Sequence, residues 1–145
     1  MDLRAIREAI SERIATVPGV RPVAFAPDTV STGNAVLVVV GHGDPYVNYH
    51  EAFNKGLAMV NMTLSPYVPM NDPRSAFAVL DELVSSGTGS PRSLIDALMD
   101  SDRTLGGVCS DLVVDDASNV QTIEPAAGVR FLSCDLAIRI PVGRS

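Results

Sequence analysis

VRFLSCDLAIRIPV, at residues 129–142, alternates apolar and polar side chains almost from end to end. This period of two predicts a β-strand with one face in the core and one face in water. The apolar set is Leu132, Cys134, Leu136, Ile138 and Ile140, and the polar set is Ser133, Asp135 and Arg139. Such one-sided burial is typical of antiparallel sheets.

Other segments extend this sheet. LAMVNMTLSPYV, at 57–68, alternates in the same way, whereas AVLVVV, at 35–40, is apolar on both faces and should be a central strand. VCSDLVVDD, at 108–116, alternates in part, and a short extended piece is expected at 23–26. Residues 117–128, rich in Ser, Asn, Pro and Gly, are expected to form a hairpin loop, either without regular structure or with a few extended residues. The 57–68 segment turns Ala58, Val60, Met62, Leu64 and Val68 to one side and Asn61, Thr63 and Ser65 to the other.

Three helices are expected. The first spans 2–17, with Asp2 as N-cap and Pro18-Gly19 at its end. The second begins at Asp72-Pro73 and the third at Ser90-Pro91, because a capping residue followed by proline favours a helix start. The apolar residues expected to face the core are Leu3, Ile6, Ile10, Ile14 and Val17 in the first helix, Phe77, Leu80, Leu83 and Val84 in the second, and Leu94, Ile95 and Leu98 in the third.

The order helix, strands, two helices, strands predicts an α+β fold. We expect a single domain, residues 1–145, with a mostly antiparallel sheet of four to five strands. The N-terminal helix and a helical hairpin should pack on that sheet. A chain of this length buries enough surface to fold without a metal or disulfide.

Composition narrows the function classes. The net charge is −6, and the single lysine is Lys55, so no cluster of cations offers a footprint for nucleic acid or an anionic membrane. Cys109 and Cys134 are expected to be free, reduced thiols in strands. The charged start MDLRAIREAI is not typical of a signal peptide, and AVLVVV is too short to cross a bilayer.

GHGDPYVNYH, at 41–50, holds both histidines and a carboxylate: His42, Asp44 and His50. A zinc site needs three or four converging ligands, and this broken loop lacks a helical HxxxH register. No GxSxG elbow or phosphate-binding glycine loop is present, and GTGS at 87–90 is better explained as a turn. We therefore predict no metal, no cofactor and no catalytic residue.

The span 41–56 lies between two strong strands and has no convincing periodicity of its own. Long loops in compact domains are often functional. Aromatic residues are enriched in protein interfaces. Tyr46, Tyr49, Phe53 and Lys55 are therefore candidates for contacts with a partner or another subunit. The alternative is a surface loop without a role.

The sequence resembles the tail terminator proteins of long-tailed, siphovirus-type phages, especially those of actinobacterial hosts. Four segments, in this order and spacing, carry the resemblance over nearly the whole chain: DLRAIREAISERIATVPGV, YHEAFNKGLAMVNMTL, LDELVSSGTGSPRSLIDAL and DRTLGGVCSDLVV. The segment GHGDPYVN has no clear counterpart in that family, so the resemblance assigns no role to His42 or Asp44.

The resemblance implies a non-enzymatic virion protein. Such proteins form a ring, typically hexameric, at the head-proximal end of the tail tube; the ring stops tail polymerisation and provides the surface for head-tail joining. The implied partners are other copies of the chain, the major tail tube protein and a head-side connector or completion protein. DNA only passes through the channel, no membrane is involved, and assembly takes place in the host cytoplasm.

Asp111, Asp115 and Asp116 are candidates for a channel-facing or rim surface of such a ring. Their alternative interpretation is that of solvated carboxylates at a strand end, because the spacing of a calcium loop is missing. Two other functions remain open: a different neck or head-tail connector protein, and a small enzyme that uses the 41–50 loop.

Overall fold

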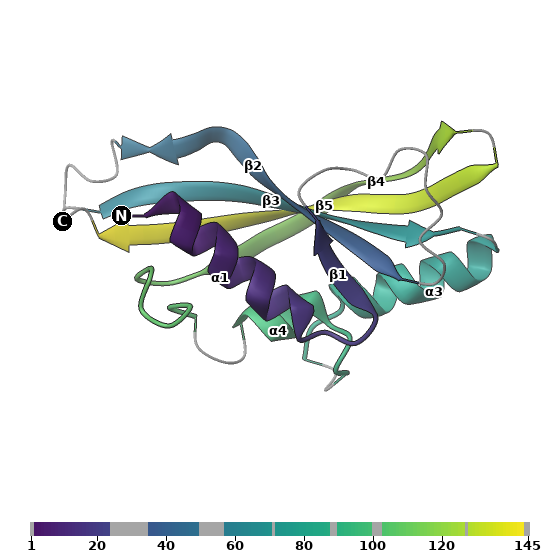
Figure 1. Cartoon of the computed structure of the whole chain (residues 1–145), viewed down its shortest axis with the longest axis horizontal. Coiled ribbons are helices and arrows are strands. Elements are labelled where there is room, and N and C mark those ends of the chain that lie inside the picture. Colours follow the sequence, from purple (N-terminus) through teal and green to yellow (C-terminus); the bar gives the residue numbers. More distant parts are fainter. Residues whose placement is uncertain are drawn as a thin grey trace.

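A computed structural model describes residues 2–23, 35–49, 57–70, 72–87, 90–99, 103–126 and 128–143. In these ranges the chain forms a sheet and three helices (Figure 1). The elements in chain order are α1 (Leu3–Ala15), β1 (Val20–Val23), β2 (Val36–Asn48), β3 (Leu57–Pro69), α3 (Pro73–Val84), α4 (Leu94–Met99), β4 (Val113–Ala126) and β5 (Val129–Gly143).

The sheet has the strand order β1-β2-β3-β5-β4. Strand β1 runs parallel to β2, and all other neighbours are antiparallel. The predicted α+β fold is therefore confirmed, with five strands in a mixed, mostly antiparallel sheet. The short extended piece expected at 23–26 begins earlier, at Val20, and only Val23 of that piece lies in the described residues.

The helices lie together on one side of the sheet, and one core joins them to it (Figure 1). The alternation in β3 and β5 is confirmed: the apolar set of each strand is buried in this core. AVLVVV is also confirmed as a central strand. Val36, Val38 and Val40 face the helices, and Leu37, on the opposite face, is only 6% exposed.

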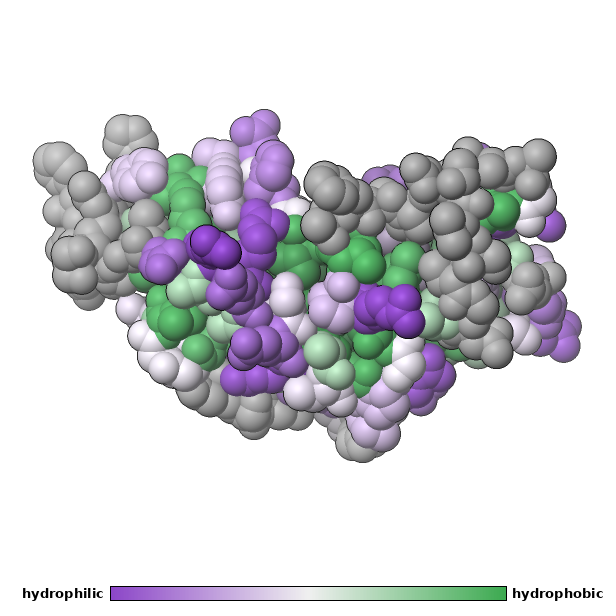
Figure 2. Space-filling view, in the orientation of Figure 1, coloured by the Kyte–Doolittle hydropathy of each residue, from purple (hydrophilic) through white to green (hydrophobic). Residues whose placement is uncertain are grey.

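Helix α1 follows its sequence signals closely. The Asp2 carboxylate accepts a 3.1 Å hydrogen bond from the Ala5 N–H, which satisfies one of the free donors at the helix start. Ile6, Ile10 and Ile14 are fully buried, since residues three to four apart share one helix face. The opposite face of α1 appears as a band of hydrophilic residues in Figure 2.

Helices α3 and α4 form the predicted hairpin. The Ser93 hydroxyl donates to the Ser85 carbonyl, so the connection between the two helices is closed by a side chain. One detail was wrong: Phe77, expected in the buried stripe of α3, is 45% exposed. Ala76 takes that place, because it shares the face of Leu80 and Leu83.

Further boundaries differ from expectation. Helix α4, expected to start at Ser90-Pro91, begins at Leu94. Residues 41–48, expected to be part of a loop, continue β2. Residues 117–126, expected to be a hairpin loop, continue β4, and residues 108–112 precede that strand. Both extensions lie at the margin of the sheet, where a strand is paired on one side and its side chains are largely solvated, so burial imposes no alternation on their sequences.

Candidate functional site

The stretch GHGDPYVN forms an oversized bulge in β2. His42 pairs with Met62 and Val47 with Val60, so residues 43–46 lie opposite Asn61 alone. The Asn61 side-chain amide donates a 2.9 Å hydrogen bond to the Pro45 carbonyl and fixes the bulge to β3. A Cβ at Gly43 would lie 2.9 Å from the Asn61 Cβ, so glycine is needed for this close approach.

The bulge brings Tyr46 to helix α1. Arg7 Nη2 donates a 3.0 Å hydrogen bond to the Tyr46 hydroxyl, and the guanidinium carbon lies 5.8 Å from the ring centroid. Arg7 also donates to the Val40 carbonyl, on the same strand. The His42 ring lies 5.5 Å from the Tyr46 ring. Tyr46 is half-buried, and it joins the strand to the helix within one subunit.

The other candidates for partner contacts are placed differently. Tyr49, at the end of β2, is 54% exposed and is one of three large apolar or aromatic side chains that are exposed in the described part of the chain. Phe53 and Lys55 lie outside the described residues. Of the four candidates, the described structure therefore presents Tyr49 as the exposed aromatic residue.

The histidines show no metal-binding arrangement in the part that is described. His42 and Asp44 are exposed, and His42 Nδ1 lies 3.0 Å from the Gly43 carbonyl oxygen. His50 lies outside the described residues. Among residues that the structure describes, no group of three His, Cys, Asp or Glu side chains is placed to hold a metal ion. The absence of a metal stays a prediction.

The three aspartates proposed as a channel or rim surface have separate surroundings. Asp111 forms a 2.9 Å ion pair with Arg103 and accepts a hydrogen bond from the Leu112 N–H, so it closes the turn before β4. Asp115 accepts from Arg139 Nε at 2.7 and 2.9 Å. Asp116 is exposed. Asp116 is therefore a solvated carboxylate, as in the alternative interpretation, whereas Asp111 and Asp115 are ion-paired.

The side of the sheet opposite the helices carries a polar network. Asp135 accepts hydrogen bonds from Ser65 Oγ at 2.8 Å and from Asn119 Nδ2 at 3.1 Å, which links β3, β5 and β4. Asn119 has a φ of 56°, a conformation that asparagine tolerates better than most residues. The Arg139–Asp115 pair also joins β5 to β4. The sequence contained the signal for this network, in the polar half of the 129–142 alternation.

The pKa values of two groups near Asp135, Cys134 and Tyr67, are raised. Burial, with a smaller contribution from the Asp135 charge, raises the pKa of the Cys134 thiol to about 11. The same two causes raise the pKa of Tyr67. Cys109 and Cys134 are both buried, and neither forms a disulfide bond in the described part of the chain. Cys134 lies in β5, but Cys109 lies in the turn before β4, so its assignment to a strand was wrong.

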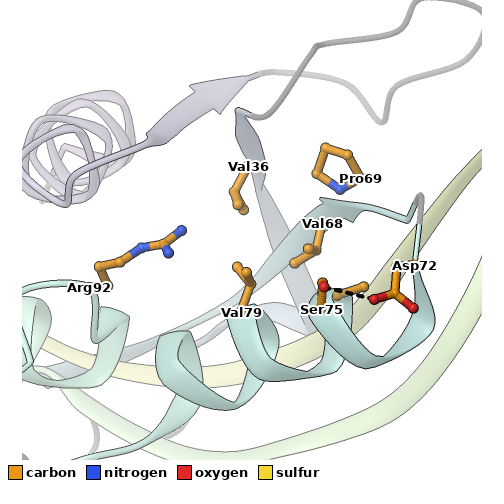
Figure 3. Close-up of a pocket in the computed structure, with 8 residues that line it drawn as sticks. Val36, Val68, Pro69, Asp72, Ser75, Val79 and Arg92 are labelled. Atoms are coloured by element: carbon orange, nitrogen blue, oxygen red, sulfur yellow. Dashed lines mark hydrogen bonds between the residues drawn. The ribbon is translucent and has the colours of Figure 1, made fainter.

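A groove of about 340 Å³ lies between α3 and the adjoining parts of β2 and β3 (Figure 3). Val36, Val68 and Val79 point toward one another in it. The Asp72 carboxylate, which accepts a 2.8 Å hydrogen bond from Ser75, borders one end, and Arg92 borders the other. Most of the lining residues are apolar, and the Ser75–Asp72 contact lies at the start of α3 at one end of the groove, so the groove suits an apolar side chain better than a polar substrate.

Sequence comparison adds no assignment: no family model matches the chain, and no curated protein matches it. Of the helices in the described ranges, none combines the length and apolar character that a membrane-crossing helix needs.

Proposed function

We propose that this protein is a tail terminator of a long-tailed phage: a ring-forming structural protein at the head-proximal end of the tail tube. The ring stops tail polymerisation and provides the surface on which the head-side connector docks. Its partners are other copies of the chain, the major tail tube protein and the connector. The proposal rests first on the four segments whose order and spacing resemble that family.

One structural observation supports it most. In the described residues the helices cover one face of the sheet. On the opposite face a buried apolar patch with Leu37 and Phe131 adjoins a stretch of polar side chains from β3, β4 and β5. Residues 115–122 of β4 are all exposed. An extended surface of this kind suits contacts with neighbouring proteins better than binding of a small substrate, which needs a concave pocket with converging polar groups.

Charge supports the passage of DNA without binding. The chain has a net charge of −6, so a ring of six copies would carry six times −6, or −36. DNA is a polyanion, so it is held by clustered Lys and Arg and repelled by a surface of net negative charge. Arg103 and Arg139 are both neutralised by aspartates, Asp111 and Asp115, on the β4 side of the molecule.

Tyr49 is the residue through which we expect contact with another subunit or with the tube. It is aromatic and 54% exposed at the end of β2, and exposed aromatics are the side chains that most often carry binding energy in interfaces. Tyr49→Ala should weaken tail capping while the melting temperature stays nearly constant. Phe77→Ala is the matched control, because Phe77 is 45% exposed on α3, which lies far from the C-terminal end of β2 next to Tyr49 (Figure 1).

The test is a phage that lacks this gene. We expect tails longer than normal and heads that remain without tails, with both defects corrected by the wild-type protein. Tyr49→Ala should correct them poorly, and Phe77→Ala should correct them fully. Tails of normal length joined to heads in the absence of the protein would refute the proposed function.

A further inference from the structure

Among the residues that the structure describes, the sheet ends in two edges without a further strand, and the backbone groups there decide whether copies of this chain can join by adding strand to strand. One edge is formed by β1 and the part of β2 beyond it, and the other by β4. An open edge with alternating N–H and C=O groups is a template for another strand.

The β1 edge offers no free N–H group. The Val36 N–H donates to the Gly19 carbonyl at 2.9 Å, and in a parallel pair alternate residues of one strand carry the bonds to its neighbour. Arg21 and Val23 therefore turn their backbone groups to β2, whereas Val20 and Pro22 turn theirs away. The Val20 N–H is already bonded to the Val17 carbonyl, and proline has no N–H.

The outward side of β1 is accessible, so its lack of a free N–H donor does not result from being covered. A hollow of about 230 Å³, lined by Arg7, Ser11, Pro22, Val23 and Val40, lies against this edge. Where β2 extends past β1, Arg7 donates a hydrogen bond to the Val40 carbonyl. The bulge at residues 43–46 then interrupts the regular strand. Over residues 20–23 the edge is thus reachable, but its outward side presents carbonyls without a free N–H donor, and beyond β1 the backbone of β2 becomes irregular.

The β4 edge is interrupted in a different way. The pairing of β4 with β5 is irregular between Val114 and Asp116, between Ser118 and Gln121, and between Ile123 and Ala126. Only short runs of regular strand, 116–118 and 121–123, remain between these irregularities. Bulges bend an edge away from a potential partner, and exposed charges such as that of Asp116 oppose pairing further.

We propose that copies of this chain associate through side chains and do not continue the β-sheet from one copy to the next, and that Pro22 is the residue that closes the β1 edge. This inference rests on the proposed function only where it concerns the ring. The closure of the β1 edge is a property of the free protein and is tested there.

Pro22→Thr supplies the missing N–H on the outward side of β1. In dilute solution the new amide should exchange with solvent as fast as an unprotected one. At higher concentration the variant should self-associate, as measured by sedimentation velocity, and the amide should become protected. Pro73→Ala is the matched control, because Pro73 stands at an exposed helix start, and this variant should sediment as the wild type does.

Protection of amide 22 in the dilute variant would overturn the inference, because the amide would then face β2. Self-association no greater than that of Pro73→Ala would also overturn it. A second measurement does not depend on the folding of the variant: hydrogen exchange of wild-type rings on tail tubes. We expect the outward-facing amides of β4 that exchange freely in the free protein to remain free in the ring. Their protection would contradict association through side chains, whereas a complete lack of rings would count only against the proposed function.

Discussion

Arg7 in α1 and Tyr46 in β2 are joined by a 3.0 Å hydrogen bond between Nη2 and the phenol oxygen. This contact gives Tyr46, within GHGDPYVN, a role in packing inside one subunit. The bulge of four residues opposite Asn61 carries a tyrosine out of the regular strand and onto the first helix. The helix is thereby tied to a strand at the margin of the sheet, beyond the reach of β1.

Tyr46→Phe should lower the free energy of unfolding by about 1 kcal/mol, because it removes one partly buried hydrogen bond and keeps the ring. Urea denaturation measures the change. Tyr49→Phe is the control for an exposed tyrosine, with an expected effect within about 0.5 kcal/mol. Equal effects of the two variants would show that the Arg7 contact does not stabilise the fold.

Leu80→Ala should lower the free energy of unfolding by about 2–5 kcal/mol, because Leu80 is 3% exposed in the core between α3 and the sheet. Phe77→Ala, one turn earlier on the exposed side, should change it by less than about 1 kcal/mol. Thermal or urea unfolding distinguishes the two. A larger loss for Phe77→Ala would mean that the face of α3 is assigned wrongly.

The raised pKa of Cys134 predicts a loss of stability at alkaline pH. The unfolded thiol ionises as the pH passes its ordinary value of 9.0, whereas the folded thiol keeps its proton until about 11. Ionisation therefore favours the unfolded state between these values, and the stabilisation is complete below pH 9. Urea unfolding from pH 8 to 10 should show a decline that is shallower in Cys134→Ala. This range lies below most of the titration of Tyr67, and identical slopes would contradict the prediction.

Protein purified without a histidine tag should contain no stoichiometric zinc or other transition metal. His42 and Asp44 are exposed, and no ligand cluster forms among the described residues. Elemental analysis is the measurement, with His42→Ala and His50→Ala as comparisons. One zinc ion per chain, lost in these variants together with stability, would reverse the interpretation of GHGDPYVNYH.

The fold was predictable where burial imposes a pattern on the sequence. β3 and β5 are central strands with one face on the helices, so their alternation follows directly from the pleat. Asp2 and Asp72-Pro73 marked helix starts because the free N–H groups at a helix start need acceptors or a proline there. The single error on the buried faces was Phe77, whose place in the stripe belongs to the smaller Ala76.

The surfaces were less predictable. Residues 41–48 and 117–126 belong to strands, but their side chains are mostly not buried and bulges interrupt their pairing. Their sequences therefore lack the alternation of a half-buried strand and resemble loops. The ion pairs of Asp111 with Arg103 and of Asp115 with Arg139 depend on turns and register. Register is fixed by the whole sheet and not by neighbouring residues in the sequence, so these pairs could not be assigned in advance.

Electron microscopy of tail tubes assembled with the purified protein tests the central proposal most directly. We predict a ring of this protein at one end of each tube and an end to elongation when further tube subunits are added. Tubes that bind none of the protein and continue to grow at both ends in its presence would contradict the account.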